Sequence, residues 1–411
     1  MDVLELVLFA GVGILFGIIS GLLPGLHVNT MAAFLIAVLP ALSGFSAISI
    51  AAALVSMAVV NSFLSFIPSI LLGAPDSENV LSVLPGHRML LNGEAIEAIK
   101  ITAFGGIIGL IAVIITFQVS IAAIPSLTGI LHGNMHYVLL LITLFGIMLE
   151  DRPAYAAGIF VLSGIFGFIT LNSFEDGIVF PALSGMFGIS TMILSLNQEI
   201  KIPAQDKLKV TLGKISIIKN SLIGAFAGAV VGFLPGIGAA QATFLVQQAN
   251  NKQSEKEFLV SNSAVSVANT IFPLFVLFAI GKTRSGIAIA TKEVLGIIRF
   301  EGLLVLMGVA ILAGVFAYLM HIKIGIFFTN LLINKNRQNY GKLTIAMIIF
   351  LTISVFALTG INGVLVLGLG TLIGLLPPLL GVRRAECMGY FVLPTMLYYA
   401  GLSGVILKLI Y

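Results

Sequence analysis

The sequence predicts an all-α polytopic membrane protein built from two pseudo-symmetric halves. Its 411 residues are 59% hydrophobic and only 9% charged, and the mean hydropathy is +1.13, whereas soluble domains carry roughly 25% charged residues. Apolar runs of about 17–25 residues recur along the chain, and each is long enough to cross the hydrocarbon core. These runs lack the alternation of apolar and polar residues that a membrane β-barrel requires.

The first half, residues 1–210, is expected to form an N-terminal transmembrane repeat. An apolar span at about 4–23 is interrupted at Pro24-Gly25, and a short apolar piece at 30–42 follows it. A long span at 47–72 then precedes a polar stretch at 73–100. Further spans are expected near 101–124, 136–150, 154–171 and 178–196.

The second half, residues 211–411, is expected to form a C-terminal transmembrane repeat with the same order. A span near 220–234 is interrupted at Pro235-Gly236, and a short piece at 239–246 and a polar loop at 247–257 follow. A span near 264–280 then precedes a polar stretch at 281–299. The remaining spans are expected near 301–319, 322–333, 343–359, 361–380 and 388–406. Together the halves give about ten to twelve crossings and two broken, re-entrant arms, with boundaries good to about 2–4 residues.

A glycine ladder that ends in Leu-Pro-Gly occurs once in each half. The two copies are Gly13, Gly17, Gly21 with Leu23-Pro24-Gly25, and Gly224, Gly228, Gly232 with Leu234-Pro235-Gly236. Their offset is constant (224 − 13 = 211; 235 − 24 = 211), and Gly73 and Gly281 give nearly the same offset (281 − 73 = 208). A single ladder of this kind is most often a helix-packing seam. Its duplication before a proline predicts two broken helices in repeats that we expect to be inverted.

Broken helices at matching places in two halves mark the binding site of many secondary transporters. The amides freed at a half-helix N-terminus, together with its positive dipole, suit an anionic group. We therefore expect the substrate to contact residues at and near the two breaks, namely Pro24, Gly25, His27, Asn29, Thr30, Asn61, Pro235, Gly236, Gly238, Gln241, Thr243, Asn262 and Asn269. A second polar group comprises Asp76, Ser77 and Glu78. It is either a solvated loop or a site that couples Na⁺ or H⁺ to transport.

The charge distribution indicates a bilayer rather than a nucleic acid as the partner. The net charge is only +4, and the 21 Lys and Arg residues lie between apolar spans, as topology determinants do. The lysine-rich linker at 201–219 is expected to be cytoplasmic, in a multi-pass protein of the cell membrane. A single cysteine, Cys387, excludes an internal disulfide and a cysteine-based metal cluster. Gly281-Lys282-Thr283 is similar to the end of an ATP-binding loop, but Val276 stands where that loop needs glycine, so we expect no ATP. We expect no catalytic residues, metal site or resident cofactor.

At these motifs the chain resembles the large permease subunit of the tripartite tricarboxylate transporter family. The resemblance rests on the paired Leu-Pro-Gly motifs, on Gly73-Ala74-Pro75-Asp76-Ser77 with its flank, and on the Asn-rich run from Ser261 to Pro273. It implies an importer of carboxylates that an ion gradient drives. It also implies two partners, an extracytoplasmic binding protein and a small membrane subunit. Asp76 and Lys282-Thr283-Arg284 depart from the family pattern, so the resemblance predicts the fold more strongly than the cargo.

Two other functions fit parts of the sequence. A flippase for a lipid-linked phosphate carrier could use the same anion-binding arms. An intramembrane enzyme is the least favoured reading, because the spans offer neither an HExxH pair nor a convincing Ser/His or paired-Asp arrangement.

Overall fold

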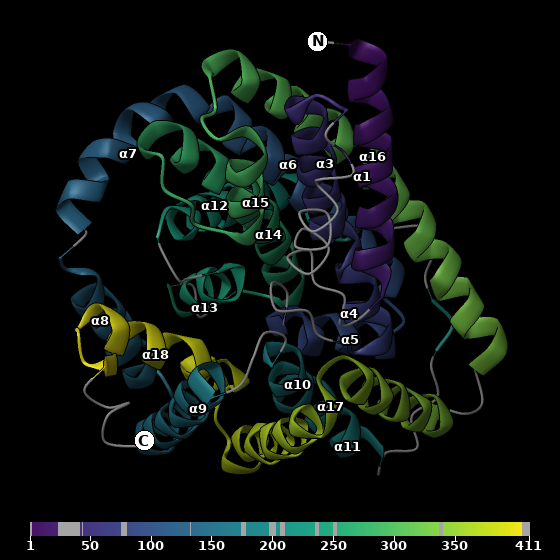
Figure 1. Ribbon diagram of the computed structural model, residues 1–411. Helices are drawn as coiled ribbons and strands as arrows, with labels where there is room; N and C mark the ends of the chain where they lie inside the picture. Colours follow the sequence, from purple (N-terminus) through teal and green to yellow (C-terminus); the bar gives the residue numbers. More distant parts are fainter. Residues whose placement is uncertain are drawn as a thin grey trace. The chain divides into compact units, whose positions relative to one another are not determined.

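The described chain is helical, as Figure 1 shows. The computed structural model describes residues 2–23, 42, 44–74, 80–131, 133–173, 178–196, 203–205, 210–234, 238–249, 253–336 and 340–404. These residues cluster into two compact units, and each unit draws on both halves of the sequence. The first unit comprises Met1–Pro125, Ile200–Thr243 and Lys252–Tyr340, and the second comprises Ser126–Glu199, Phe244–Asn251 and Gly341–Tyr411.

Most described helices belong to one unit; α7 and α13 are divided between the two, and α17 has its first residue, Tyr340, in the first unit. The first unit contains α1 (Val3–Leu22), α3 (Ala47–Leu64), α4 (Phe66–Leu72), η2 (Val80–Ser82), α5 (Val83–Leu91), α6 (Ala95–Ile115), α12 (Lys214–Phe233), α14 (Glu255–Ile280), α15 (Gly286–Leu295) and α16 (Phe300–Asn336). The second contains α8 (Met135–Met148), α9 (Pro153–Ser173), α10 (Val179–Leu183), the π-helix η3 (Ser184–Ile189), α11 (Ser190–Leu196), α17 (Tyr340–Leu380), η4 (Arg384–Met388) and α18 (Gly389–Tyr399). The divided helices are α7 (Phe117–Leu131) and α13 (Ala239–Ala249).

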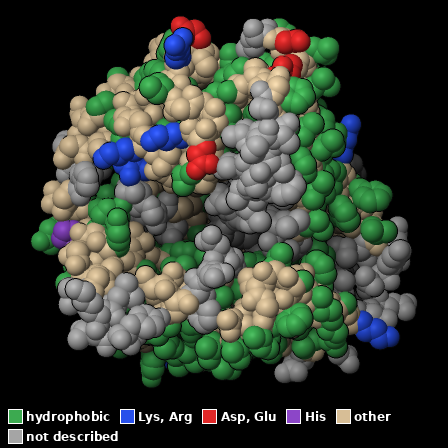
Figure 2. Space-filling model, in the orientation of Figure 1, with side chains coloured by type: hydrophobic (Ala, Val, Ile, Leu, Met, Phe, Trp, Pro, Cys, Tyr) green, Lys and Arg blue, Asp and Glu red, His purple; other side chains and the backbone are tan. Residues whose placement is uncertain are grey.

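The polytopic membrane fold predicted from composition is confirmed. Within the described residues, eight helical segments are long and apolar enough to span a bilayer, and four shorter apolar helices accompany them. Large apolar side chains are exposed along these segments, for example Val7 at 59%, Phe226 at 73% and Leu312 at 72%. Hydrophobic side chains accordingly cover much of the face seen in Figure 2. Such a surface suits lipid, because soluble proteins rarely expose continuous apolar patches of this extent.

Several predicted boundaries were wrong, each for an identifiable reason. The spans expected at 301–319 and 322–333 form the single helix α16, because Met320 and His321, which lie between them, do not interrupt the helix. Helix α14 begins at Glu255, nine residues before the predicted 264 (264 − 255 = 9), because Ser254 and Glu257 form a capping box. The polar stretches 73–100 and 281–299 contain the short helices α5 and α15. The predicted break between 359 and 361 is confirmed at Gly360, where φ is 64°.

The first glycine ladder is a packing seam between α1 and α3. A Cβ at Gly13 would overlap the carbonyl of Ala53, one at Gly17 would lie 2.6 Å from the carbonyl oxygen of Met57, and one at Gly21 would lie 2.8 Å from Cβ of Leu64. Residue numbers therefore rise together along both helices, so α1 and α3 run parallel. At their common start, the Glu5 carboxylate accepts hydrogen bonds from the backbone N–H and hydroxyl of Ser46 at 2.8 and 2.7 Å.

The second ladder forms an equivalent seam between α12 and α14. A Cβ at Gly224 would overlap the carbonyl of Ser261, one at Gly228 would lie 2.5 Å from the carbonyl oxygen of Val265, and one at Gly232 would lie 3.2 Å from Cβ of Phe272. The partners of the three glycines follow the sequence offset (261 − 53 = 208; 265 − 57 = 208; 272 − 64 = 208). Gly73 and Gly281, with φ of 63° and 66°, directly follow the second candidate membrane span of each half, Ala47–Leu72 and Glu255–Ile280. The repeat seen in sequence is thus a repeat of packing.

The helices of the first unit show that these repeats are inverted. Helix α6 runs parallel to α14, because Glu97 meets Lys256 and a Cβ at Gly109 would lie 2.8 Å from Cα of Ala264. Helix α16 runs parallel to α3, because positions 302 and 314 approach Ile48 and Val59. By contrast, α6 and α16 are antiparallel, since Thr102 meets His321 and Ile99 meets Gly325. Each of the pairs α1/α12, α3/α14 and α6/α16 therefore has opposite directions, as an inverted repeat requires.

The second unit is also held by close glycine contacts. On α9, a Cβ at Gly164 would lie 2.5 Å from a side-chain carbon of Leu393, and one at Gly167 would overlap the backbone of Tyr390. On α17, Gly370 and Gly374 approach the backbones of Ala182 and Met186 in the same way. Helix α9 thus packs closely on α18, and α17 packs closely on α10 and η3, as small residues allow in membranes.

Candidate functional site

The predicted substrate-contacting residues divide into those that the structure describes and those that it does not. Ten predicted positions lie outside the described residues: Pro24, Gly25, His27, Asn29, Thr30, Asp76, Ser77, Glu78, Pro235 and Gly236. The described positions are Asn61, Gly238, Gln241, Thr243, Asn262 and Asn269. Gly238 directly precedes α13 and Gln241 lies within it.

Asn61 and Asn269 occupy equivalent positions at the ends of the two glycine ladders (269 − 61 = 208). A Cβ at Gly21 would lie 3.4 Å from Cα of Asn61, and one at Gly232 would lie 3.6 Å from Cα of Asn269. Asn61 is used within the seam, where its amide donates to the Ser20 hydroxyl at 3.1 Å. Helix α14 continues for 11 residues past Asn269 (280 − 269 = 11), a distance of about 16 Å at 1.5 Å per residue. Helix α12 therefore ends well inside the thickness that α14 crosses.

Helix α13 begins shortly after this interruption and brings Thr243 to Asn262. The Thr243 hydroxyl donates to Oδ1 of Asn262 at 2.6 Å, and both side chains are buried, with exposures of 1% and 0%. The amide nitrogen of Asn262 has no hydrogen-bond partner within the described part of the chain. Leaving a buried donor unpaired costs roughly 1–3 kcal/mol. The structure thus joins two residues that the sequence selected separately, and it leaves one strong donor available.

The chemistry of the Thr243–Asn262 pair suits an anionic or strongly accepting group. The amide of Asn262 offers N–H donors, and the first turn of α13 adds backbone N–H groups with the positive end of a helix dipole. These donors are neutral, so they recognise a carboxylate by directed hydrogen bonds. A bound acceptor would supply the hydrogen bond that the Asn262 amide lacks among the described residues.

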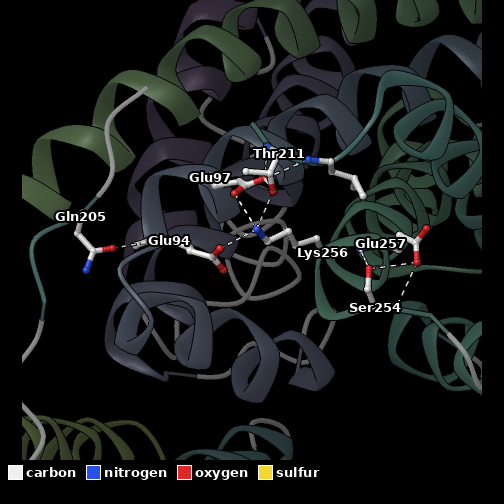
Figure 3. A network of polar contacts seen from close by, with 9 residues as sticks. Glu94, Glu97, Gln205, Thr211, Ser254, Lys256 and Glu257 are labelled. Carbon is white, nitrogen blue, oxygen red and sulfur yellow. Dashed lines mark hydrogen bonds and ion pairs between the residues drawn. The ribbon is translucent and has the colours of Figure 1, made fainter. Parts of the chain in front are cut away.

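A network of charged residues holds the start of α14, two turns before Asn262 (Figure 3). The Lys256 ammonium donates to Glu94 at 2.8 Å, to Glu97 at 2.9 Å and to the Thr211 hydroxyl at 2.9 Å. Glu97 also accepts from the backbone N–H of Thr211 at 2.6 Å. The linker is fixed a second time by Gln205, whose side chain accepts from the N–H of Ala95 at 2.8 Å. The network therefore joins the two halves and anchors the linker between them.

The equivalent contact at the opposite end of the first unit is apolar. Lys256 and Glu94 correspond by the repeat offset to Ile48 and Gly302 (256 − 48 = 208; 302 − 94 = 208). A Cβ at Gly302 would lie 3.8 Å from Cδ1 of Ile48. The two ends of the inverted repeat thus share their backbone packing but differ in chemistry. Sequence reasoning missed this network, and the available signal was the set of charged residues in the first turns of α6 and α14.

One family model matches nearly the whole chain. The family model described as "Tripartite tricarboxylate transporter TctA family" matches residues 7–389. An uncharacterized protein of Methanocaldococcus jannaschii is 28% identical over 419 aligned positions, which cover 95% of this chain and 98% of that protein. No solved structure matches the chain significantly.

Proposed function

Because the chain belongs to the tripartite tricarboxylate transporter TctA family, we propose that it is a secondary active transporter of small organic anions such as carboxylates, driven by an ion gradient. Because this is a family of transporters, we start from a transport function. What we propose is the cargo and the ion that drives its uptake. The observation that carries the proposal is the unpaired, buried amide of Asn262 beside the half-helix α13.

Inverted halves provide a route to alternating access. Two arrangements of nearly equal energy arise when each half can adopt the conformation of the other. The packing of the two glycine ladders follows one offset rule in both halves, which supports such an exchange. A cargo held near α13 could then be exposed to each side of the cell membrane in turn.

The coupling ion and the partner proteins are further parts of this proposal. Na⁺ and H⁺ are the candidate ions, and Asp76, Ser77 and Glu78 are the sequence candidates for binding one of them. The family name suggests that a small membrane subunit and an extracytoplasmic binding protein assemble with this chain. Neither partner is needed for a cargo to bind at Asn262 in our proposal.

Counterflow in proteoliposomes tests the function without a driving gradient. Purified protein is reconstituted into vesicles loaded with one unlabelled mono-, di- or tricarboxylate, and entry of the same labelled compound is followed. We expect entry above that of protein-free vesicles for at least one carboxylate. A parallel arm measures flipping of a fluorescent lipid-linked phosphate. Flipping without carboxylate exchange would replace our proposal by the flippase, and absence of both activities would refute transport of either cargo.

A further inference from the structure

His321 is a buried histidine at the crossing of helices from both halves. It lies on α16 and is only 1% exposed. Its ring contacts Thr102 on α6, and the backbone carbonyls of Phe63 on α3 and Ile99 on α6 face it. Ionisable residues inside a membrane are rare because they are costly, and they commonly mark ion or proton pathways. No motif singled out this residue.

One tautomer of His321 uses the hydroxyl of Thr102 as an acceptor. The Thr102 hydroxyl lies 2.9 Å from the carbonyl oxygen of Ala98 and 3.0 Å from that of Ile99. When it donates to one of these carbonyls, its oxygen accepts from Nε2–H of His321, 3.0 Å away. In that neutral ring Nδ1 is an acceptor, and it has no hydrogen-bond partner among the described residues. In this tautomer Nδ1 is therefore a buried basic nitrogen with an unused lone pair.

The groups that face this ring are neutral. The sequence of α3 and α4, residues 47–72, contains no titratable residue. On α6, Glu97 is already bonded to Lys256 and Thr211, and Lys100 is half-buried near the helix start. On α16, the Tyr318 ring packs on Phe104 with centroids 5.9 Å apart, and Lys323 is exposed. The two carbonyls that face the ring are acceptors, so they favour an added N–H donor.

Only one helix separates His321 from the proposed cargo site. On α6, Thr102 contacts His321, and Gly105 lies one turn further along. A Cβ at Gly105 would overlap Ser263 Oγ and the carbonyl of Val260, which flank Asn262 in the sequence. A shift of α6 that follows a change at His321 would therefore reach the Thr243–Asn262 pair directly.

We propose that Nδ1 of His321 binds the proton that drives uptake of the anionic cargo, an inference that rests on the proposed function. A proton from water adds to Nδ1, and Nε2–H stays bonded to Thr102. The resulting positive charge is expensive in a closed apolar crossing. The charged ring therefore favours a conformation in which water reaches His321 or one in which the anion is bound nearby. Release of the proton to the other side restores the neutral ring.

The test compares driven uptake with exchange in the same proteoliposomes. The variants are His321→Gln, Thr102→Val and Thr329→Val. Thr329→Val is a matched control, because Thr329 is buried on the same helix and its hydroxyl donates to the Gly325 carbonyl at 2.7 Å. A pH step of one unit can drive about tenfold accumulation when one proton accompanies one cargo molecule. We expect this accumulation in the wild type and in Thr329→Val, and its loss in His321→Gln with counterflow retained. Thr102→Val, which keeps the histidine, should shift the pH profile of uptake.

The outcomes separate the two proposals. Suppose that His321→Gln shows counterflow and also the same proton-driven accumulation as the wild type. This result would overturn the proton site and leave the transport function intact. Accumulation driven by a Na⁺ gradient alone would overturn it as well. If His321→Gln does not fold, proton uptake by the wild-type protein in detergent on addition of the carboxylate decides, measured with a pH-sensitive dye. Our inference requires about one proton per bound cargo, and none would contradict it. Absence of counterflow in the wild type would remove the proposed function, and the inference with it.

Discussion

The glycine ladders predict opposite effects for two nearby alanine substitutions on α1. At Gly17 an added Cβ would lie 2.6 Å from the carbonyl oxygen of Met57 and 2.7 Å from Cβ of Val60. Ordinary contacts begin at 3.4 Å, so α1 and α3 would have to separate locally by about 0.8 Å (3.4 − 2.6 = 0.8). At Gly11, by contrast, the new Cβ would meet nothing within 4 Å. The pair therefore isolates the close approach from the general effect of removing glycine.

The magnitudes follow from these distances. Alanine in place of glycine within a helix is worth about 0.5–1 kcal/mol when nothing opposes it, so Gly11→Ala should be slightly stabilising. Overpacking of a close contact costs about 1–3 kcal/mol, so Gly17→Ala should be neutral to destabilising. The two variants should differ by about 1–3 kcal/mol, which corresponds to roughly 2–12 °C in Tm for a unit of this size.

The assay is thermal loss of helical circular dichroism for the purified variants in one detergent. Scan rates must be equal, because membrane proteins often unfold irreversibly and Tm then depends on the rate. Gly228→Ala on α12, where a Cβ would lie 2.5 Å from the Val265 carbonyl oxygen, repeats the test in the other half. Equal stability of the Gly11 and Gly17 variants would refute the packing seam and with it the structural basis of the repeat.

Three further predictions concern buried polar groups. Burial raises the pKa of the Cys387 thiol to about 12, so the folded protein should resist maleimide at neutral pH and react once denatured; rapid mass increase of the folded protein would contradict this burial. Lys256→Met should lower the unfolding free energy by about 1–3 kcal/mol because it leaves the buried Glu97 carboxylate without its cation; adding Glu97→Gln should recover part of the Tm, and no recovery would contradict the ion pair. Burial lowers the pKa of His87. Below about pH 6.5 the unfolded state therefore binds a proton that the folded state does not, and the free energy of unfolding falls as the pH falls. A Tm that rises on acidification, or the same change of Tm with pH in His87→Gln as in the wild type, would show that His87 does not contribute.

The features that the sequence predicted correctly are those fixed by local patterns. Span positions follow from runs of apolar residues, and the two glycine ladders follow from glycines four apart before Leu-Pro-Gly. The sequence favoured a binding role for these ladders over a packing seam, whereas in the structure the glycines pack α1 on α3 and α12 on α14. The capping box at Ser254 and Glu257 was also readable as Ser-x-x-Glu, but the surrounding charges suggested a loop. The helix start at Glu255 was therefore misplaced although its signal was present.

The remaining features depend on partners that are distant in the sequence. The two spans expected at 301–319 and 322–333 are one helix, α16, in which His321 is buried against Thr102 and Lys323 is exposed. Thr243 and Asn262 were each selected for polarity, yet nothing local indicates that they bond to each other. The inverted arrangement that the repeat led us to expect is seen in the contacts between α6, α14 and α16. Tertiary packing determines these features, and single-sequence patterns do not carry it.

The role of Asn262 as the anion donor can be tested most directly by carboxylate counterflow in matched variants. Asn262→Ala removes the unpaired amide, and Thr243→Val removes the hydroxyl that orients it. Losing one hydrogen bond to a charged group costs about 1.5–3 kcal/mol, so the half-saturating carboxylate concentration should rise about 10- to 100-fold in Asn262→Ala. Thr243→Val should show a smaller increase, and Asn61→Ala, in the equivalent seam but bonded to Ser20, should leave that concentration nearly unchanged. Normal carboxylate affinity in a folded Asn262→Ala variant would contradict the account.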